Sequence, residues 1–394
     1  MVLKLNHDMR PDSTPEETAR MRFVSAFRSF ILNDLAADMR SAYDKRAARA
    51  YARSNGAAPR TSGEAYRAML GDPAFEVYTA CRIYAQRMVW DSVRPGVERE
   101  AERLEALEAT LPELGSLTLD PDFVAPRNVS ALDVHLMPGS YTGDENSSPL
   151  MPGAVYDRGL AIFSMGLMGK NLNDIGLSMS NYIKARYPEF APRAILDLGC
   201  TIGHNTLPWK TAYPAATVHG IDASGPCLRY AHARARLQGK EVHFRQMNAE
   251  ALDFPDASMD LVFSSMFLHE ISLKTIGKVM EEAHRVLRPG GLMLHMELPP
   301  NSQMGPFEGF YLDWDSYYNE EPFYKTFRDQ DPRELCAKAG FPPENYFQFV
   351  VPSIGIYGED AVREAARSDS VKVNDETTGR LARGVKWFGF GAWK

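Results

Sequence analysis

One stretch of the sequence, residues 194–222, constrains the fold more than any other. It begins with an apolar run that ends in Asp197 and continues into a loop that contains Gly199 and Gly203. Polar residues suited to open a helix follow, and then a second strand-like run ends in Asp222. This order predicts a strand, a glycine turn, a helix and a second strand. Glycines let the backbone approach a ligand closely, because a Cβ there would collide with it, and a helix N-terminus offers unpaired N–H groups.

The acid at the end of the second run and the spacing of the glycines indicate the kind of ligand. Asp222 lies about twenty residues after the turn, where a carboxylate can accept hydrogen bonds from both hydroxyls of a ribose. A dinucleotide fingerprint needs G-x-G-x-x-G, so that a pyrophosphate can lie on the helix N-terminus. Here Thr201 stands at the place of a middle glycine. The spacing therefore disfavours a nicotinamide-dependent oxidoreductase.

The loop Asp-Leu-Gly-Cys-Thr-Ile-Gly, residues 197–203, resembles the D-x-G-x-G-x-G loop of class I S-adenosylmethionine-dependent methyltransferases, with Thr201 in place of the second glycine. Later segments follow the order of that family, and the resemblance covers residues 183–298 in register. The matching segments are a third strand at 241–247, a fourth at 259–265, the turn Pro289-Gly290-Gly291 and a fifth strand at 292–298.

The resemblance implies an α/β fold, a Rossmann-like seven-stranded sheet with helices on both faces, with residues 346–351 and 385–393 as a final antiparallel pair at its edge. It also implies S-adenosylmethionine as the cofactor. Loop residues would frame the methionine part, Asp222 the ribose, and Asn248, where the family often has Asp, the adenine. The cofactor-binding residues expected on this basis are Asp197, Gly199, Cys200, Gly203, Asp222, Ala223, Asn248 and Ala249.

Apolar periodicity and turn-forming residues divide the chain into three predicted regions. Residues 1–115 read as an all-helical N-terminal domain that starts with the capping box Thr14-Pro15-Glu16-Glu17 and is broken at Pro95-Gly96. Residues 116–159 are rich in Pro, Gly, Asn and Asp and are predicted to be a loop-rich connection over the active site. The resemblance implies a methyltransferase domain over 160–394, with 299–330 as an insertion that faces the acceptor. The resemblance implies that the N-terminal helices form a lid over the acceptor; a homodimer interface, or both roles together, remain open.

Composition excludes several classes of function. The formal net charge of −7 and the absence of a dominant basic cluster argue against nucleic acid as the substrate. The four cysteines form no C-x-x-C pair, and no acid cluster demands a metal. No apolar run has the about 18–20 residues that a membrane helix needs. The sequence therefore predicts a cytoplasmic protein with a small-molecule acceptor, no metal, no nucleic acid and no membrane partner.

Methyl transfer from a sulfonium is an in-line displacement in which the leaving group departs neutral, so the protein mainly aligns the two reactants. A base can in addition remove a proton from the acceptor. His269 directly follows the fourth strand, at the carboxyl edge of the sheet where ligands bind, and a neutral histidine is a competent base. Glu270 beside it could orient the ring. Tyr156 completes the catalytic residues that we expect.

The acceptor site is expected from aromatic and acidic residues near the same edge. The candidates are His135, Tyr141, Glu297, Tyr311 and Trp314. Oxygen, nitrogen and carbon all remain open as the acceptor atom, because one histidine and several carboxylates serve any of them. A protein that binds S-adenosylmethionine without methylating, as a structural partner or for other chemistry, is the alternative from a different functional class.

Overall fold

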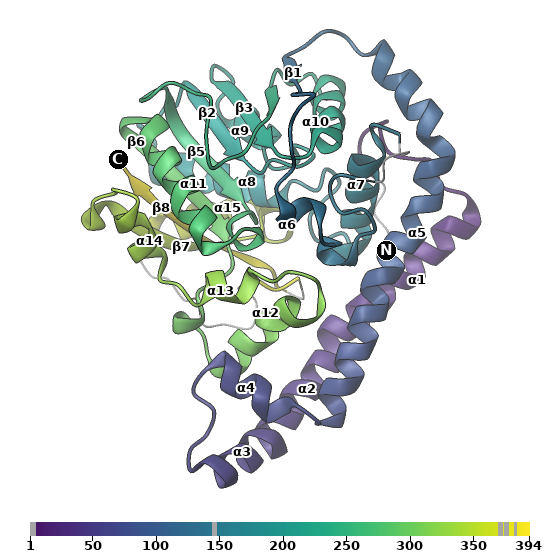
Figure 1. Ribbon diagram of the computed structural model, residues 1–394, viewed down its shortest axis with the longest axis vertical. Helices are drawn as coiled ribbons and strands as arrows, with labels where there is room; N and C mark the ends of the chain where they lie inside the picture. The colour runs from purple at the N-terminus through teal and green to yellow at the C-terminus, as the bar shows by residue number, and fades with distance from the viewer. Residues whose placement is uncertain (1–4, 144–147, 369–372, 374–377, 382–383) are drawn as a thin grey trace.

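In the computed structural model, which describes residues 5–143, 148–368, 373, 378–381 and 384–394, one mixed sheet of eight strands forms the centre of the molecule (Figure 1). The strand order is β1-β4-β3-β2-β5-β6-β8-β7. All neighbouring pairs are parallel except β6–β8 and β8–β7, which are antiparallel. The strands are β1 (Ser116–Thr118), β2 (Ala194–Leu198), β3 (Thr217–Asp222), β4 (His243–Gln246), β5 (Met259–Ser265), β6 (Leu287–Glu297), β7 (Tyr346–Pro352) and β8 (Lys386–Trp393). The predicted Rossmann-like sheet and its antiparallel edge pair are confirmed.

The short strand β1 is an addition to the seven predicted strands. It extends the sheet beyond β4, where Leu117 pairs with Phe244. Gly115, which precedes it, has a φ of +66°, and a Cβ on it would lie 2.1 Å from the carbonyl oxygen of Val242. The strand therefore depends on a glycine that permits close backbone approach, and three residues are too few to show an alternating pattern.

Helices cover both faces of the sheet, as predicted. On one face α8 (Asp174–Arg186), α9 (Leu207–Ala212), α10 (Gly225–Leu237) and α15 (Ile354–Arg367) pack on one set of alternating strand residues, which includes Ile195 and Phe263. On the other face α11 (Leu273–Val286) and α14 (Pro332–Lys338) pack on the opposite set, which includes Leu196 and Val262. Successive strand residues point to opposite faces, so these apolar runs are buried on both sides.

The N-terminal region is helical. A continuous helical stretch begins after the capping box of Thr14 and Glu17, which is confirmed, and ends at Gly56 with a φ of +78°. Its segments are α1 (Pro15–Phe30), the π-helical turn η1 (Ile31–Leu35), α2 (Ala36–Ala42), the π-helical turn η2 (Tyr43–Ala47) and α3 (Ala48–Asn55). After α4 (Ser62–Met69), α5 (Pro73–Thr110) runs antiparallel along α1 (Figure 1).

The predicted break at Pro95-Gly96 is wrong, because α5 continues through both residues for 38 residues in all. Val93 and Val97 on either side are fully buried in a core cluster that α5 shares with α1. Gly96 faces α1 closely, since a Cβ on it would lie 3.6 Å from the carboxylate of Glu17. This packing outweighs the loss of one backbone hydrogen bond at Pro95.

The predicted connection over residues 116–159 is only partly loop. The helix α7 (Met151–Phe163) begins inside it, with Pro152 in its first turn, and α10 and α5 pack against α7. The shorter elements in the rest of the chain are α6 (Arg127–Ser130), η3 (Val134–Leu136), η4 (Leu268–Glu270), η5 (Asn301–Gln303), α12 (Pro306–Tyr318), α13 (Tyr324–Arg328) and η6 (Pro343–Asn345).

The N-terminal helices and the segment after β6 share one core. Buried Phe75 and Tyr78 of α5 pack with Phe310, Tyr311 and Trp314 of α12. Figure 1 shows α12 and α13 between the sheet and α4. The N-terminal helices thus pack against the same chain, near the carboxyl ends of β5 and β6. Among the described residues, no helix combines the length and apolar character that crossing a membrane requires.

Candidate active site

The glycine loop after β2 turns sharply through three residues with positive φ. Gly199 and Gly203 both have a φ of +68°, and Thr201 has a φ of +48°. A Cβ on Gly199 would lie 2.5 Å from the ring of Phe267, so only glycine fits there. Thr201 is a β-branched residue in a region that such residues rarely adopt. Its backbone N–H donates a 2.9 Å hydrogen bond to Oδ2 of Asp222, which ties the loop to the end of β3.

Asp222 lines a pocket beside the glycine loop, called here the nucleoside pocket after the ligand that the sequence predicts for it. Its Oδ1 accepts a hydrogen bond from the backbone of Ser224 at 2.8 Å, so each carboxylate oxygen is oriented by one N–H group. Burial raises the pKa of Asp222, and the N–H groups of Ser224 and Thr201 partly offset that rise. Asn248 lines the same pocket, and its Oδ1 accepts from the N–H of Glu250 at 3.0 Å. Ala223 and Ala249 complete the predicted residues in this wall.

A second, larger cavity adjoins the nucleoside pocket. The two share five lining residues, which are Tyr141, Gly199, Thr201, Met266 and Glu270. Segments far apart in the sequence build the larger cavity. Its other lining residues include Arg28, Arg82, His135, Tyr156, Phe163, Asp197, Cys200, His204, His269, Tyr311, Asp315, Glu321, Tyr324 and Arg380. A molecule in one pocket can therefore meet a molecule in the other at the glycine loop.

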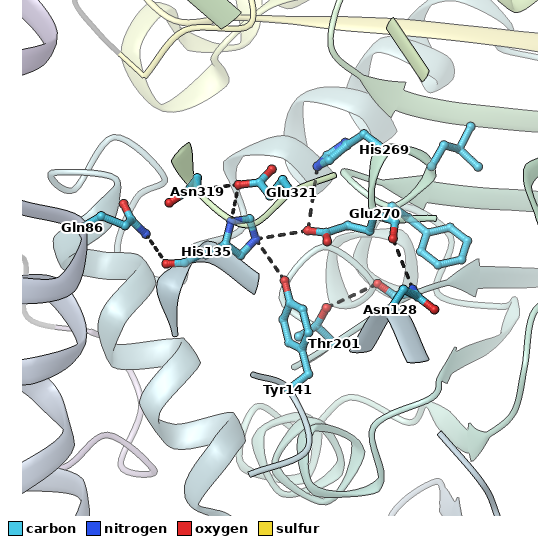
Figure 2. Close-up of polar contacts among 12 residues, drawn as sticks. Gln86, Asn128, His135, Tyr141, Thr201, His269, Glu270, Asn319 and Glu321 are labelled. Carbon is cyan, nitrogen blue, oxygen red and sulfur yellow. Dashed lines mark hydrogen bonds and ion pairs between the residues drawn. The ribbon is translucent and has the colours of Figure 1, made fainter. Parts of the chain in front are cut away.

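His269 lines the cavity from η4 and is held from behind by Glu297. Nδ1 of His269 lies 2.6 Å from Oε2 of Glu297, and its Nε2 lies 3.9 Å from Oε1 of Glu270. Burial lowers the pKa of His269, but the charge of Glu297 and the hydrogen bond to it raise the pKa to about 9. The imidazole is therefore strongly basic, and its other ring nitrogen faces Glu270 (Figure 2).

His135 joins two carboxylates at the boundary of the two pockets (Figure 2). Its Nδ1 lies 2.8 Å from Glu321, and its Nε2 lies 3.1 Å from both Glu270 and the hydroxyl of Tyr141. Burial lowers the pKa of His135, but the charges of Glu321 and Glu270 raise it well above its usual value. His135 is thus an imidazolium that neutralises part of the acidic wall. Its backbone φ of +60° is held by Gln86, which donates to its carbonyl oxygen at 2.9 Å.

His135, Glu270 and Glu321 are also the residues whose ligand atoms lie close enough for a metal ion, within 4.8 Å of one another. The two carboxylates, however, lie at opposite nitrogens of the ring. An ion that bound all three residues would need one of them to move. The geometry suits two hydrogen bonds to a protonated imidazole better than a metal centre. The expectation of no metal stays a prediction.

Three predicted loop and helix residues lie in the cavity wall. Asp197 accepts a 2.6 Å hydrogen bond from the hydroxyl of Thr206, and burial raises its pKa to about 7. Tyr156 stacks at a tilt near Tyr141, with ring centroids 5.5 Å apart. Burial raises the pKa of the Tyr156 phenol, so the phenol keeps its proton at neutral pH. Cys200 is buried, and burial raises the pKa of its thiol well above the usual range.

Three predicted residues lie outside both pockets, among the residues that the structure describes. Glu297 is fully buried behind His269 and does not reach the acceptor space. Trp314 packs in the core, where its Nε1 donates to Thr79 and the guanidinium of Arg82 lies 3.9 Å from its ring centroid. Gly203 packs on Phe244 and shapes the loop from behind. The expected acceptor contacts of Glu297 and Trp314 are therefore corrected, whereas Tyr311 does line the cavity.

Sequence reasoning missed five charged residues of the cavity, two from the N-terminal helices and three from the segments after β6. They are Arg28, Arg82, Asp315, Glu321 and Arg380. A signal was present for Arg28. It follows buried Val24 by four residues and precedes buried Ile31 by three, so it is a charged residue within the apolar stripe of a helix.

Comparison with known proteins identifies the central segment. Residues 195–291 match a family model described as a methyltransferase domain. A demethylmenaquinone methyltransferase from Thermus thermophilus is 38% identical over 112 residues, 28% of this chain and 50% of that protein. A malonyl-[acyl-carrier protein] O-methyltransferase from Pseudescherichia vulneris is 31% identical over 123 residues, 31% of this chain and 46% of that protein. The chain spans about half the length of the curated relatives that it matches.

Among solved structures, phosphoethanolamine N-methyltransferase 2 of Haemonchus contortus, in complex with S-adenosyl-L-methionine, is similar at 20% identity with a TM-score of 0.39. The match covers 60% of this chain and 57% of that one.

Proposed function

We propose that the whole chain transfers a methyl group from S-adenosylmethionine to a small molecule, since residues 195–291 match a methyltransferase-domain model. One observation carries the proposal. The nucleoside pocket and the larger cavity meet at Gly199, Thr201, Met266 and Glu270. An in-line displacement needs the donor carbon and the acceptor atom to face each other across such a junction.

The cofactor fits the smaller pocket and the loop that borders it. Asp222 would bind the ribose hydroxyls through the oxygens that Thr201 and Ser224 orient. Asn248 and Ala249 would border the adenine. The methionine end would then pass the glycine loop toward Asp197 in the larger cavity, where a carboxylate suits a positively charged ligand.

One base accounts for the proton that the methyl transfer releases. The bond from sulfur to the methyl carbon breaks as the bond from the acceptor atom to that carbon forms, and neutral S-adenosylhomocysteine leaves. An acceptor that began as O–H, N–H or acidic C–H gives its proton to Nε2 of His269. Glu297 stabilises the imidazolium that results, because its carboxylate is 2.6 Å from Nδ1. Aromatic walls such as Tyr156 and Tyr311 suit a sulfonium and a flat or apolar acceptor.

Residues outside the matched domain determine which acceptor the cavity binds. Arg28 and Arg82 come from the N-terminal helices, His135 from the connection, and Tyr311 from the segment after β6. None of these lies within residues 195–291. The substrates named for the two relatives are therefore not carried over. The N-terminal helices act as a fixed wall of the acceptor cavity, which supports the lid alternative over a region used only for dimerisation.

Methyl transfer can be measured without knowing the acceptor. We expect the purified protein to move label from methyl-labelled S-adenosylmethionine into small molecules of a cell extract that has been freed of protein and nucleic acid. His269→Gln should reduce this transfer while leaving the affinity for S-adenosylhomocysteine within about twofold, since the nucleoside pocket does not include His269. Tight cofactor binding with no transfer from any extract would favour the alternative, a binding protein that does not methylate.

A further inference from the structure

Arg28 is a buried cation in the wall of the acceptor cavity. Its side chain is only 3% exposed, and both of its hydrogen bonds go to uncharged acceptors. Nε donates to the carbonyl oxygen of Phe163 at 3.0 Å, and Nη1 donates to Oε1 of Gln86 at 2.7 Å. The guanidinium also lies 4.2 Å from the ring centroid of Phe163. No carboxylate in the described part of the chain forms an ion pair with it.

Most other buried or nearly buried arginines of the described chain are paired with an acid; the exception is Arg158, which lies outside the cavity and donates to the hydroxyl of Ser13. Arg82 binds both oxygens of Asp315 at 2.9 and 2.8 Å, Arg234 binds Asp157, and Arg328 binds Asp313. Burying a charge without a partner is costly, so buried charges are normally paired. Burial, and after it the charge of Arg82, lower the pKa of Arg28 to about 9. Burial therefore destabilises the positive charge of Arg28 in the ligand-free protein.

A second guanidinium lines the same cavity. The guanidinium of Arg380 lies 3.9 Å from the ring centroid of Tyr311, and its buried Nε has no hydrogen-bond partner among the described residues. Its described contacts include no carboxylate. Of the described acids that line the cavity, Asp315 binds Arg82, and Glu270 and Glu321 bind His135, while Asp197 accepts from the hydroxyl of Thr206 and pairs with neither Arg28 nor Arg380. The cavity therefore has positive charge left over at Arg28 and Arg380.

We propose that the methyl acceptor is a carboxylate-bearing small molecule whose carboxylate binds Arg28, with Arg380 as a second contact. The inference rests on the proposed function and names the substrate class of that site. A single negative charge balances one buried guanidinium, and Nη2 of Arg28 has no hydrogen-bond partner among the described residues. A phosphoryl group has related charge chemistry, and the binding comparison with phenyl phosphate below separates it from a carboxylate.

The position of Arg28 also orients such an acceptor. Gln86, which binds Arg28, donates through Nε2 to the carbonyl oxygen of His135, and His135 contacts Glu270 at the junction with the cofactor pocket. The carboxylate at Arg28 thus lies on the same wall as the junction, with the body of the molecule between aromatic side chains. His269, the base of the proposed transfer, lines the same cavity.

Measurements of ligand binding test whether Arg28 binds a carboxylate or only stabilises the fold. Wild-type protein saturated with S-adenosylhomocysteine is titrated with benzoate, benzamide and phenyl phosphate. We expect benzoate to bind at least tenfold more tightly than its neutral isostere benzamide. Arg28→Met should remove that preference, and Arg28→Lys should keep part of it. Arg20→Met, on the same helix but with an exposed side chain that pairs with Glu16, is the matched control and should change nothing. Equal or absent binding of benzoate and benzamide by the wild type, or a preference for phenyl phosphate, overturns the proposal.

A transfer assay then tests the acceptor itself. A small-molecule extract is separated by ion exchange at neutral pH into anionic, neutral and cationic pools, and each pool is incubated with the protein and methyl-labelled S-adenosylmethionine. Label should enter the anionic pool, at least a hundredfold more slowly with Arg28→Met and at an unchanged rate with Arg20→Met. Transfer into the neutral or cationic pool overturns the carboxylate proposal and leaves the methyltransferase function standing. Transfer into no pool, although the cofactor binds, overturns the function and the inference with it.

Discussion

Nδ1 of His269 lies 2.6 Å from Oε2 of Glu297, and the other oxygen of the same carboxylate accepts hydrogen bonds from the backbone N–H groups of Phe267 and Leu268 at 2.9 and 2.6 Å. One buried residue at the end of β6 therefore fixes the ring of His269 and the backbone that carries it. Glu297 lies outside the cavity, so it is a positioning residue. It makes His269 basic and leaves Nε2 on the acceptor side.

Glu297→Gln tests that positioning role. The amide keeps an oxygen for the two N–H groups but loses the charge that stabilises the imidazolium. A charge-assisted hydrogen bond contributes about 1.5–3 kcal/mol, so we expect kcat to fall roughly 10- to 100-fold. The affinity for S-adenosylhomocysteine should not change, because Glu297 lines neither pocket. A fall in cofactor affinity as large as the fall in kcat would show that the residue acts on the fold instead.

The pH dependence of turnover follows from the raised pKa of His269. A base must be neutral to accept a proton, and the pKa of about 9 keeps most of the imidazole protonated at pH 7. We therefore expect kcat to rise with pH up to about 9 and then level off. In Glu297→Gln the rising limb should move to lower pH, because the charge that raises the pKa is gone. A wild-type profile that is flat from pH 6 to 9 would remove His269 as the base.

Asp222→Asn tests the ribose site. The asparagine keeps one oxygen for the N–H groups of Thr201 and Ser224 but loses the charge and one acceptor. Loss of a charge-assisted contact costs about 1.5–3 kcal/mol, which corresponds to about 10- to 100-fold weaker binding of S-adenosylmethionine by calorimetry. Asp253→Asn, an exposed acid on the loop after β4 that pairs with Arg245, is the control and should leave affinity unchanged. Unchanged affinity in Asp222→Asn would mean that the ribose lies elsewhere.

The glycine loop offers a matched pair of substitutions. Gly199→Ala places a Cβ 2.5 Å from the ring of Phe267, in a pocket wall and at a positive φ, so we expect weaker cofactor binding and a lower thermal midpoint. Thr201→Gly removes a β-branched side chain from a φ of +48°. That relief, about 1 kcal/mol, roughly offsets the greater freedom of glycine in the unfolded chain, so the midpoint should change little. The pair is compared by thermal unfolding with and without S-adenosylhomocysteine. A large loss of affinity in Thr201→Gly would mean that the threonine side chain itself binds the cofactor.

The sheet and its nucleoside pocket could be predicted because the relevant signals are local. Each strand of the core is an apolar run of a few residues, and the loop between Asp197 and Asp222 has its glycines where positive φ is required. The strand β1 could not be predicted because three residues are too few to show an alternating apolar pattern. The continuation of α5 through Pro95 could not be predicted either. It depends on packing against α1, which lies in another part of the chain.

The acceptor cavity could be predicted only in part, since it is assembled from distant segments. His135, Tyr141 and Tyr156 were found because aromatic and ionisable residues cluster before the cofactor domain. The ion pairs that define the cavity join residues more than a hundred positions apart, such as Arg82 with Asp315 and His135 with Glu321. No local pattern reports such pairs. Glu297 was correctly predicted at the carboxyl end of a strand. The alternation of residues along that strand could not show that His269 would cover Glu297.

Calorimetric titration of the wild-type protein with S-adenosylmethionine, S-adenosylhomocysteine and NAD tests the central claim most directly. We predict that both sulfur nucleotides bind at micromolar concentration with one site per chain, and that NAD gives no signal. Binding of NAD without either sulfur nucleotide would contradict the assignment of the pocket at Asp222 and, with it, the proposed methyl transfer.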